Sequence, residues 1–185
     1  HVPPFGGSDL LLGTNPIAFS APNVGDDPFV FDMATTVAAM GKIKTLLQQG
    51  EPMPEGWMVG RDGKPLTDPA RKSEGFLLPI GGPKGFGLSM AIGLMAGVLN
   101  GAAFGSDVVN FTNDTTSSTN TGQFVMALDP AAFGIADFGA NAARVFDEMR
   151  ASPPLPGHDP VRMPGEGKSA AAKARNAKGL NLKPA

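Results

Sequence analysis

The chain has 185 residues, of which 42% are hydrophobic and none is cysteine, and its formal net charge is −2 at pH 7. This composition supports a folded core in one domain or slightly more, and it excludes disulfides and thiolate metal sites. Nucleic acid is not expected as a partner because no basic cluster is interleaved with aromatic residues, and no apolar stretch is long enough to cross a membrane.

The first third of the sequence predicts a loop, two short strands and one amphipathic helix. Residues 1–16 are rich in Pro and Gly, residues 17–20 predict a strand, and residues 29–31 predict a buried strand. Thr35 or Thr36 can cap a helix that ends at Gly50. The apolar stripe of this helix consists of Val37, Met40, Ile43 and Leu47.

The most informative stretch runs from Gly81 to Leu88, where four glycines and Lys84 lead into an apolar helical pattern. Glycine lets a backbone approach a ligand closely, and a helix start attracts an anion through its free N–H groups and dipole. The segment therefore favours a nucleotide site, although a simple turn before a core helix is the commoner structure for such spacing. It is not the pattern G-x-G-x-x-G, because Met90 occupies the last glycine position. The expected core face of the helix consists of Leu88, Ile92, Met95 and Leu99.

The remaining sequence predicts one more strand and two more helices. Residues 51–75 are rich in turn-forming residues, and residues 124–128 predict a strand. Residues 138–149 predict an amphipathic helix, and the Ala-rich residues 169–178 predict a last one after a Pro/Gly loop. Because short strands and helices alternate irregularly, the fold class is α+β or mixed α/β.

A series of short motifs follows in a fixed order. They are Gly13-Thr14-Asn15-Pro16, Phe31-Asp32-Met33-Ala34-Thr35-Thr36, Gly41-Lys42-Ile43, Pro54-Glu55-Gly56-Trp57, Asp62-Gly63 with Thr67-Asp68-Pro69, the glycine-rich segment 81–88, and Pro164-Gly165-Glu166. This series resembles the malate/L-lactate dehydrogenase type 2 family over nearly the whole chain. That family also holds ureidoglycolate dehydrogenases, sulfolactate dehydrogenases and cyclic-imine 2-carboxylate reductases.

The resemblance implies an NAD- or NADP-dependent oxidoreductase that moves a hydride between nicotinamide C4 and C2 of a 2-hydroxy or 2-oxo acid. The implied fold is a non-Rossmann one, with a largely antiparallel sheet flanked by helices. The resemblance also implies a homodimer with its active site near the subunit interface. Residues 1–150 are expected to form the cofactor-binding core, and residues 151–185 a Pro/Gly loop and a helix that packs back on it or on a missing N-terminal domain. We expect a cytoplasmic protein, because the first residues do not resemble a signal peptide.

Site residues are also implied by the resemblance. The motif that approaches the nicotinamide and the substrate holds Thr14 and Asn15. Cofactor contacts are expected from Asp32, Met33, Ala34, Pro83, Lys84, Gly165 and Glu166. Pro83 departs from the family, which commonly has His or another ring at this position, and proline has no N–H to donate.

No catalytic residue is assigned within the chain. The family's acid/base His and its substrate-gripping Arg are expected upstream of His1, so the chain is expected to be a fragment that is inactive alone. His158 lies in a loop and matches no catalytic position, and two histidines without carboxylates at ligand spacing predict no metal site.

Two alternatives stay open. Within the family, the chain could come from a ureidoglycolate dehydrogenase or a cyclic-imine 2-carboxylate reductase. A non-catalytic binding or structural module is the second alternative, because no complete acid/base constellation is present. A nucleotide hydrolase that uses residues 165–169 is rejected, because Arg162 stands where a P-loop requires glycine.

Overall fold

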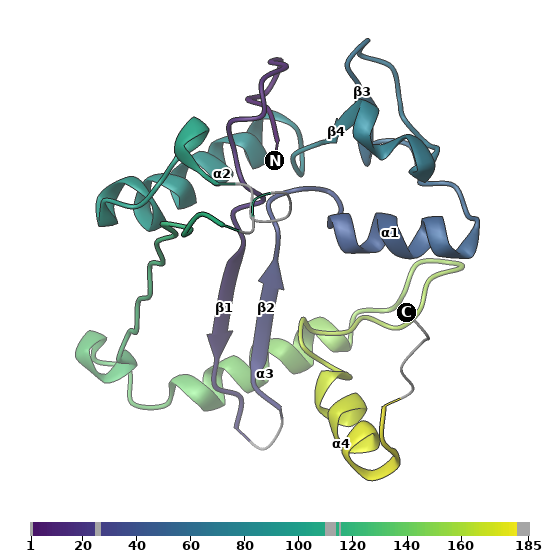
Figure 1. The fold of residues 1–185 in the computed structure, drawn as a ribbon. Helices are drawn as coiled ribbons and strands as arrows, with labels where there is room; N and C mark the ends of the chain where they lie inside the picture. Colours follow the sequence, from purple (N-terminus) through teal and green to yellow (C-terminus); the bar gives the residue numbers. More distant parts are fainter. Residues whose placement is uncertain (1, 25–26, 110–113, 115, 181–185) are drawn as a thin grey trace. The chain divides into compact units, whose positions relative to one another are not determined.

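The structure is a computed structural model that describes residues 2–24, 27–109, 114 and 116–180. It has two compact units, drawn together in Figure 1. Unit 1 comprises His1–Ile17 and Met33–Met126, and unit 2 comprises Ala18–Asp32 and Ala127–Ala185. The boundary expected at residue 150 stays a prediction, because a compact unit is not by itself an independently folding domain.

The described residues of unit 1 form two α-helices and one antiparallel strand pair. The helices are α1 (Met40–Gln49) and α2 (Pro83–Ala96), and β3 (Met58–Gly60) pairs with β4 (Gly75–Leu77). Short 3-10 helices are η1 (Pro69–Glu74), η2 (Val98–Asn100) and η3 (Gly105–Asp107). The core of the unit consists of Val2, Leu12, Ala38, Ile43, Met53, Met58, Leu66 and Leu77.

Helix α1 confirms the predicted helix but begins later than its sequence suggests. Its N-cap is Ala39, not a threonine, because Thr35 and Thr36 use their hydroxyls elsewhere: Thr35 Oγ1 donates to the Thr14 carbonyl and Thr36 Oγ1 to the Ala38 carbonyl. The helix ends at Gly50, whose φ of 71° lies in the left-handed region, as predicted.

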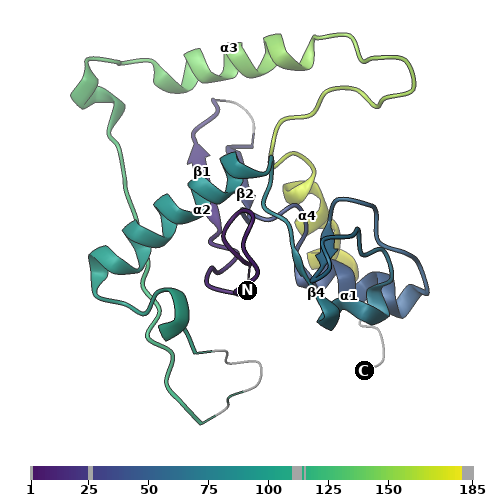
Figure 2. The same ribbon diagram turned by 90° about the horizontal axis from the view of Figure 1, so that it is seen from above.

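Helix α2 buries a face different from the predicted apolar stripe. Its buried residues are Gly85, Ser89 and Gly93, spaced four apart, whereas Met95 and Leu99 are exposed. The prediction of the core face was wrong because almost every residue of this helix is apolar or small, so periodicity cannot select a side. The small side chains let the N-terminal loop lie directly beside the helix (Figure 2).

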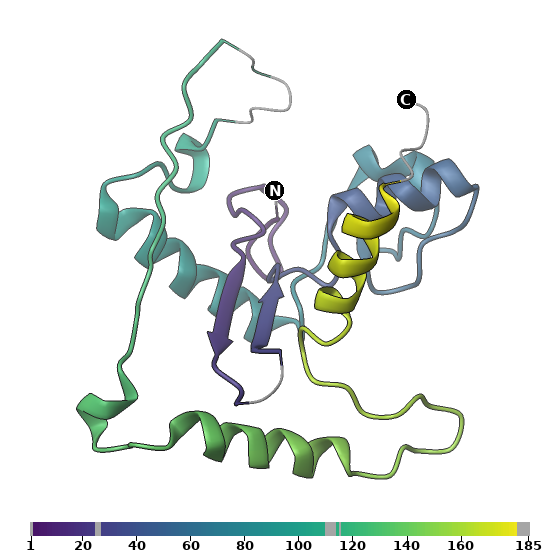
Figure 3. The same cartoon turned by 90° about the horizontal axis from the view of Figure 1, so that it is seen from below.

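Unit 2 contains a strand pair and two helices. Strands β1 (Ile17–Ala21) and β2 (Phe29–Met33) pair with one another, and their arrows run in opposite directions in Figure 1. Helix α3 (Phe138–Arg150) follows the 3-10 helix η4 (Pro130–Phe133), and a long loop leads from α3 to α4 (Lys168–Lys178), as Figure 3 shows. Both strands and both helices were predicted.

Aromatic rings join the strand pair to α3. The Phe29 ring meets the Phe19 ring edge-on at 6.0 Å between centroids, and it stacks on the Phe146 ring at 5.4 Å. These contacts attach α3 to the hairpin through Phe146.

The predicted strand 124–128 is not a strand in the structure. Its side chains are exposed, with Val125 at 86% of its full accessible surface. A β-branched, apolar sequence is a strand only when another strand supplies its hydrogen bonds, and the described residues supply none there. Conversely, β3 lies within the segment 51–75, for which turns alone were predicted, and β4 begins at its last residue.

The mixed α/β class and its non-Rossmann character are confirmed, since the described strands form two small antiparallel pairs with no parallel β-α-β unit. In the described part of the chain, every helix falls short of the length and apolarity that a membrane span requires.

Candidate cofactor and substrate site

The loop that holds Thr14 and Asn15 is attached to helix α2 through the Asn15 amide. Asn15 Nδ2 donates to the Ser89 carbonyl at 2.8 Å and to Ser89 Oγ at 3.1 Å. Asn15 is the one non-glycine residue of the described chain with a positive φ, 29°. The paired hydrogen bonds offset this backbone strain, and they fix the loop against the buried Ser89.

The carbonyl of Thr14 is equally constrained. It accepts the Thr35 N–H at 2.9 Å and the Thr35 hydroxyl at 2.9 Å, and Thr35 is almost fully buried. The Thr35 carbonyl in turn accepts the Ile80 N–H at 3.0 Å. Thr35 therefore connects the loop of Thr14 to the start of the glycine-rich segment, so the predicted substrate and cofactor segments of unit 1 are parts of one hydrogen-bonded assembly.

The glycine-rich segment turns sharply before α2 begins. Gly81 and Gly82 have φ of 57° and 61°, a conformation that favours glycine. A Cβ on Gly85 would lie 2.1 Å from the Ile80 carbonyl oxygen, so only glycine allows the helix to start this close to the preceding turn. Pro83 is the first helical residue, where its missing N–H costs nothing.

Lys84 is exposed at the first turn of α2. It has no ion-pair partner among the described residues, and it belongs to the end of the helix where the backbone dipole is positive. A free cation and a helix N-terminus at one place suit a phosphate or another anion.

The predicted residues next to β2 are less constrained. Asp32 is exposed near the end of the strand, and Met33 and Ala34 are half-buried between it and Thr35. Their backbone therefore connects β2 to Thr35, which is hydrogen-bonded to Thr14.

The Pro164–Glu166 turn is held by two elements of unit 2. The Val30 N–H of β2 donates to the Pro164 carbonyl at 3.2 Å. Gly165 has a φ of 97°, and a Cβ there would lie 3.0 Å from the Val30 nitrogen, so the turn requires glycine.

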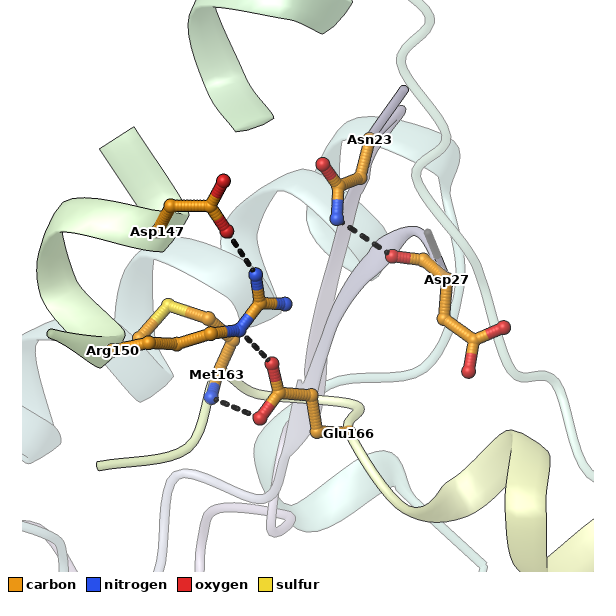
Figure 4. Close-up of polar contacts among 6 residues, drawn as sticks. All are labelled: Asn23, Asp27, Asp147, Arg150, Met163 and Glu166. Carbon is orange, nitrogen blue, oxygen red and sulfur yellow. Dashed lines mark hydrogen bonds and ion pairs between the residues drawn. The ribbon is translucent and has the colours of Figure 1, made fainter. Parts of the chain in front are cut away.

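Glu166 has both carboxylate oxygens engaged (Figure 4). Oε1 accepts a short hydrogen bond from Arg150 Nε, and Oε2 accepts the Met163 N–H at 3.0 Å. Arg150 Nη1 also donates to Asp147 Oδ1 at 2.8 Å. Each carboxylate oxygen has a second lone pair, so Glu166 can still accept a ligand hydroxyl while it holds the turn.

The sequence-predicted site residues thus fall in two places. Unit 1 holds Thr14, Asn15, Met33, Ala34, Pro83 and Lys84, and unit 2 holds Asp32, Gly165 and Glu166. Sequence reasoning missed Ser89 and Arg150 as their supports. Ser89 is the one polar residue between Phe86 and Ala96 of an apolar helix, which is a signal that could have identified it.

The described residues contain neither a histidine-based catalytic site nor a metal site. His158 is exposed, and its backbone N–H donates to the Leu155 carbonyl at 3.0 Å in a turn. His1 lies outside the described residues. Within the described ranges, no group of three His, Asp or Glu side chains is arranged to hold a metal ion.

Several dehydrogenases are among the solved structures that have a similar fold. A dehydrogenase from Sinorhizobium meliloti superposes with a TM-score of 0.82 at 39% identity, over 98% of this chain and 52% of that one. The fold of this chain is therefore a non-Rossmann fold that it shares with this dehydrogenase. The sequence profile described as malate/L-lactate dehydrogenase matches residues 1–185, and the chain belongs to this family.

Relatives at similar distance differ in the names of their substrates and cofactors. Ureidoglycolate dehydrogenase (NAD(+)) of Escherichia coli O157:H7 is 37% identical over 182 residues, covering 98% of this chain and 52% of that protein. Delta(1)-pyrroline-2-carboxylate reductase of Ancylobacter novellus is 39% identical over 97% of this chain and 52% of its own length. (2R)-3-sulfolactate dehydrogenase (NADP(+)) of Chromohalobacter salexigens is 38% identical over 70% of this chain and 39% of its own length. The chain spans about half the length of the first two relatives and less than half the length of the third.

Proposed function

We propose that this chain is the cofactor-binding part of an NAD(P)-dependent oxidoreductase of 2-hydroxy and 2-oxo acids. The observation that carries the proposal is the family match over residues 1–185. The glycine-rich turn with the exposed Lys84 at the start of α2 supports it, because this arrangement suits the anionic part of a dinucleotide. When bound, the nicotinamide supplies the hydride carrier, and the protein supplies binding, orientation and electrostatics.

In this proposal the residues of unit 1 have distinct tasks. Lys84 and the first turn of α2 bind a phosphate or ribose oxygen. Thr14 and Asn15 present their loop toward the nicotinamide and the substrate. The hydrogen bond that Thr35 donates to Thr14 and the one that Asn15 donates to Ser89 hold that loop in one orientation, which positions the reacting groups.

The remaining predicted contacts belong to the same proposal. Asp32, Met33 and Ala34 contact the cofactor from the end of β2, and Gly165 and Glu166 contact it from the turn in front of α4. An acid/base His and a substrate-binding Arg are expected upstream of His1. A homodimer, with its active site near the subunit interface, and a cytoplasmic location complete the proposal.

The test uses both cofactors and several substrates, because the relatives are named for NAD(+) or NADP(+) and for hydroxy-acid or cyclic-imine substrates. Binding of NADH and of NADPH to the full-length protein is measured by fluorescence titration. Reduction of pyruvate, oxaloacetate and Δ1-pyrroline-2-carboxylate and oxidation of ureidoglycolate are then followed through nicotinamide absorbance. A non-catalytic module would show no turnover, and a purely structural one would also show no cofactor binding.

Lys84→Ala provides the matched test of the site. Loss of one charge-assisted contact to a phosphate is expected to raise the Kd about tenfold or more. Lys64→Ala is the control, because Lys64 is also an exposed lysine of unit 1 but lies in a turn away from α2. Equal affinities for the two variants would contradict the assignment of Lys84.

A further inference from the structure

Phe5 is an exposed aromatic ring at the tip of a rigid turn. The Gly7 N–H donates to the Pro4 carbonyl at 2.8 Å, and Gly6 between them has a φ of 81°. The ends of the loop are joined by two hydrogen bonds between Val2 and Leu12, at 2.7 Å and 2.9 Å. Although the loop is fixed in this way, the Phe5 side chain keeps 56% of its surface exposed.

The Phe5 ring lies against the glycine-rich segment. Its Cε2 and Cζ atoms lie 3.3 Å and 3.9 Å from the position of a Cβ on Gly82. Gly82 immediately precedes Pro83 and Lys84, the first residues of α2. One edge of the ring therefore rests on the backbone at the helix start, and the exposed part of the ring is turned to solvent beside it.

We propose that Phe5 is a cofactor-contacting residue, on whose ring a planar ring of the dinucleotide stacks. This inference rests on the proposed function, because Lys84 must first hold the phosphates at the start of α2. A dinucleotide has a flat heterocycle on each side of its phosphates, so a ring held next to a phosphate site meets one of them. Stacking of a base on an aromatic side chain is a common and sequence-tolerant source of affinity.

The turn geometry favours a ligand role over simple packing. A residue that only covered Gly82 would not need an aromatic face, because any apolar side chain can shield a glycine backbone. The fixed turn also removes the entropy that a flexible loop would lose on binding. The ring is thus preorganised for a flat partner.

The test compares Phe5→Leu and Phe5→Tyr in the full-length protein by NADH and NADPH titration. Leucine keeps the bulk but removes the stacking face, and it is expected to raise the Kd roughly 5- to 100-fold, the range of one stacked base. Tyrosine is expected to keep wild-type affinity. Phe133→Leu is the matched control, because Phe133 is an exposed phenylalanine of η4 at 70% exposure.

The outcomes separate the two proposals. If wild type binds neither NADH nor NADPH, the proposed function fails. If wild type binds and Phe5→Leu binds equally well, the proposed function stands and the role of Phe5 is overturned. Loss of affinity in both Phe5 variants would also overturn the role of Phe5. Tyrosine keeps the stacking face, so a loss with tyrosine as well would mean that the substitutions act on the structure of the turn and not on stacking.

A fluorescence reporter identifies the contact directly. Trp57 is the one tryptophan of these 185 residues, so Phe5→Trp in a Trp57→Phe background adds a reporter at the turn, and the Trp57→Phe background alone is the control for fluorescence from any other tryptophan of the full-length protein. Saturable quenching by NADH is expected, and the absence of quenching at saturating cofactor would refute stacking. Competition by adenosine diphosphate ribose or by nicotinamide mononucleotide then identifies which of the two rings lies on residue 5.

Discussion

Two glycines of helix α2 are expected to respond in opposite ways to alanine. At Gly85 a Cβ would lie 2.1 Å from the Ile80 carbonyl oxygen, so the backbone has to move. Overpacking of this kind costs about 1–3 kcal/mol, and a backbone obstacle places it at the upper end. At Gly87 nothing lies within 4 Å of the new Cβ, so alanine gains about 1 kcal/mol of helix propensity. The same gain reduces the net loss at Gly85 to about 2 kcal/mol.

The free energies of unfolding of the two variants should therefore differ by about 3 kcal/mol, roughly two powers of ten in the unfolding constant. Urea unfolding followed by the fluorescence of Trp57 measures this difference, because Trp57 packs against the core of the same unit. A wild-type midpoint for Gly85→Ala would refute the close approach of α2 to its preceding turn. A loss of stability in Gly87→Ala would refute the open space beside that residue.

Three further predictions follow from single contacts. Ser89→Ala removes one buried acceptor of the Asn15 amide and should lower the free energy of unfolding by about 1 kcal/mol in a urea titration. Arg150→Gln leaves a half-buried carboxylate without its cation and should cost about 1–2 kcal/mol in thermal unfolding followed by circular dichroism. Arg71→Gln is the control and should cost less, because its ion pair with Glu74 is more exposed to solvent. The Ser117 hydroxyl and N–H, with those of the preceding threonine, hold the pKa of Asp114 well below its ordinary value. This stabilising effect is complete above the unfolded-state pKa and is lost as pH falls toward the folded one, so Ser117→Ala should raise the midpoint of the Asp114 carboxyl in an NMR titration.

Elements with strong local signals were predictable from the sequence. Helix α3 begins at the predicted Phe138 and α4 within one residue of the predicted start, because apolar periodicity and flanking loops mark them. The start of α1 was not predictable in the same way. Thr36 donates its hydroxyl to the Ala38 carbonyl in a local turn, and Thr35 donates its hydroxyl to Thr14, 21 residues away, a contact that only the folded chain creates.

Features that depend on contacts between residues far apart in the sequence could not be predicted from the sequence. The buried face of α2 is chosen by what lies against it: a Cβ on Gly93 would meet the ring of Phe104 at 2.2 Å. The strand expected at residues 124–128 has suitable side chains, but a strand also needs a partner backbone.

The candidate site was predicted in part. The ordered motifs identified the family, which the profile match over residues 1–185 confirms. They could not reveal that Asn15 is bound to Ser89 or that Glu166 is bound to Arg150, because these partners lie 74 and 16 residues away. The roles of the predicted site residues stay predictions until ligand binding is measured.

The two-segment origin of unit 2 has a consequence for the order of events on the ribosome. Its first segment, Ala18–Asp32, leaves the ribosome before the whole of Met33–Met126 is made, and the second segment follows only then. At roughly 5–20 residues per second, the β1–β2 hairpin waits several seconds for the helix that supplies Phe146 to Phe29. During that interval its apolar rings lack their native cover. A nascent chain stalled before residue 127 should accordingly be a better chaperone client than one released after α3 is complete.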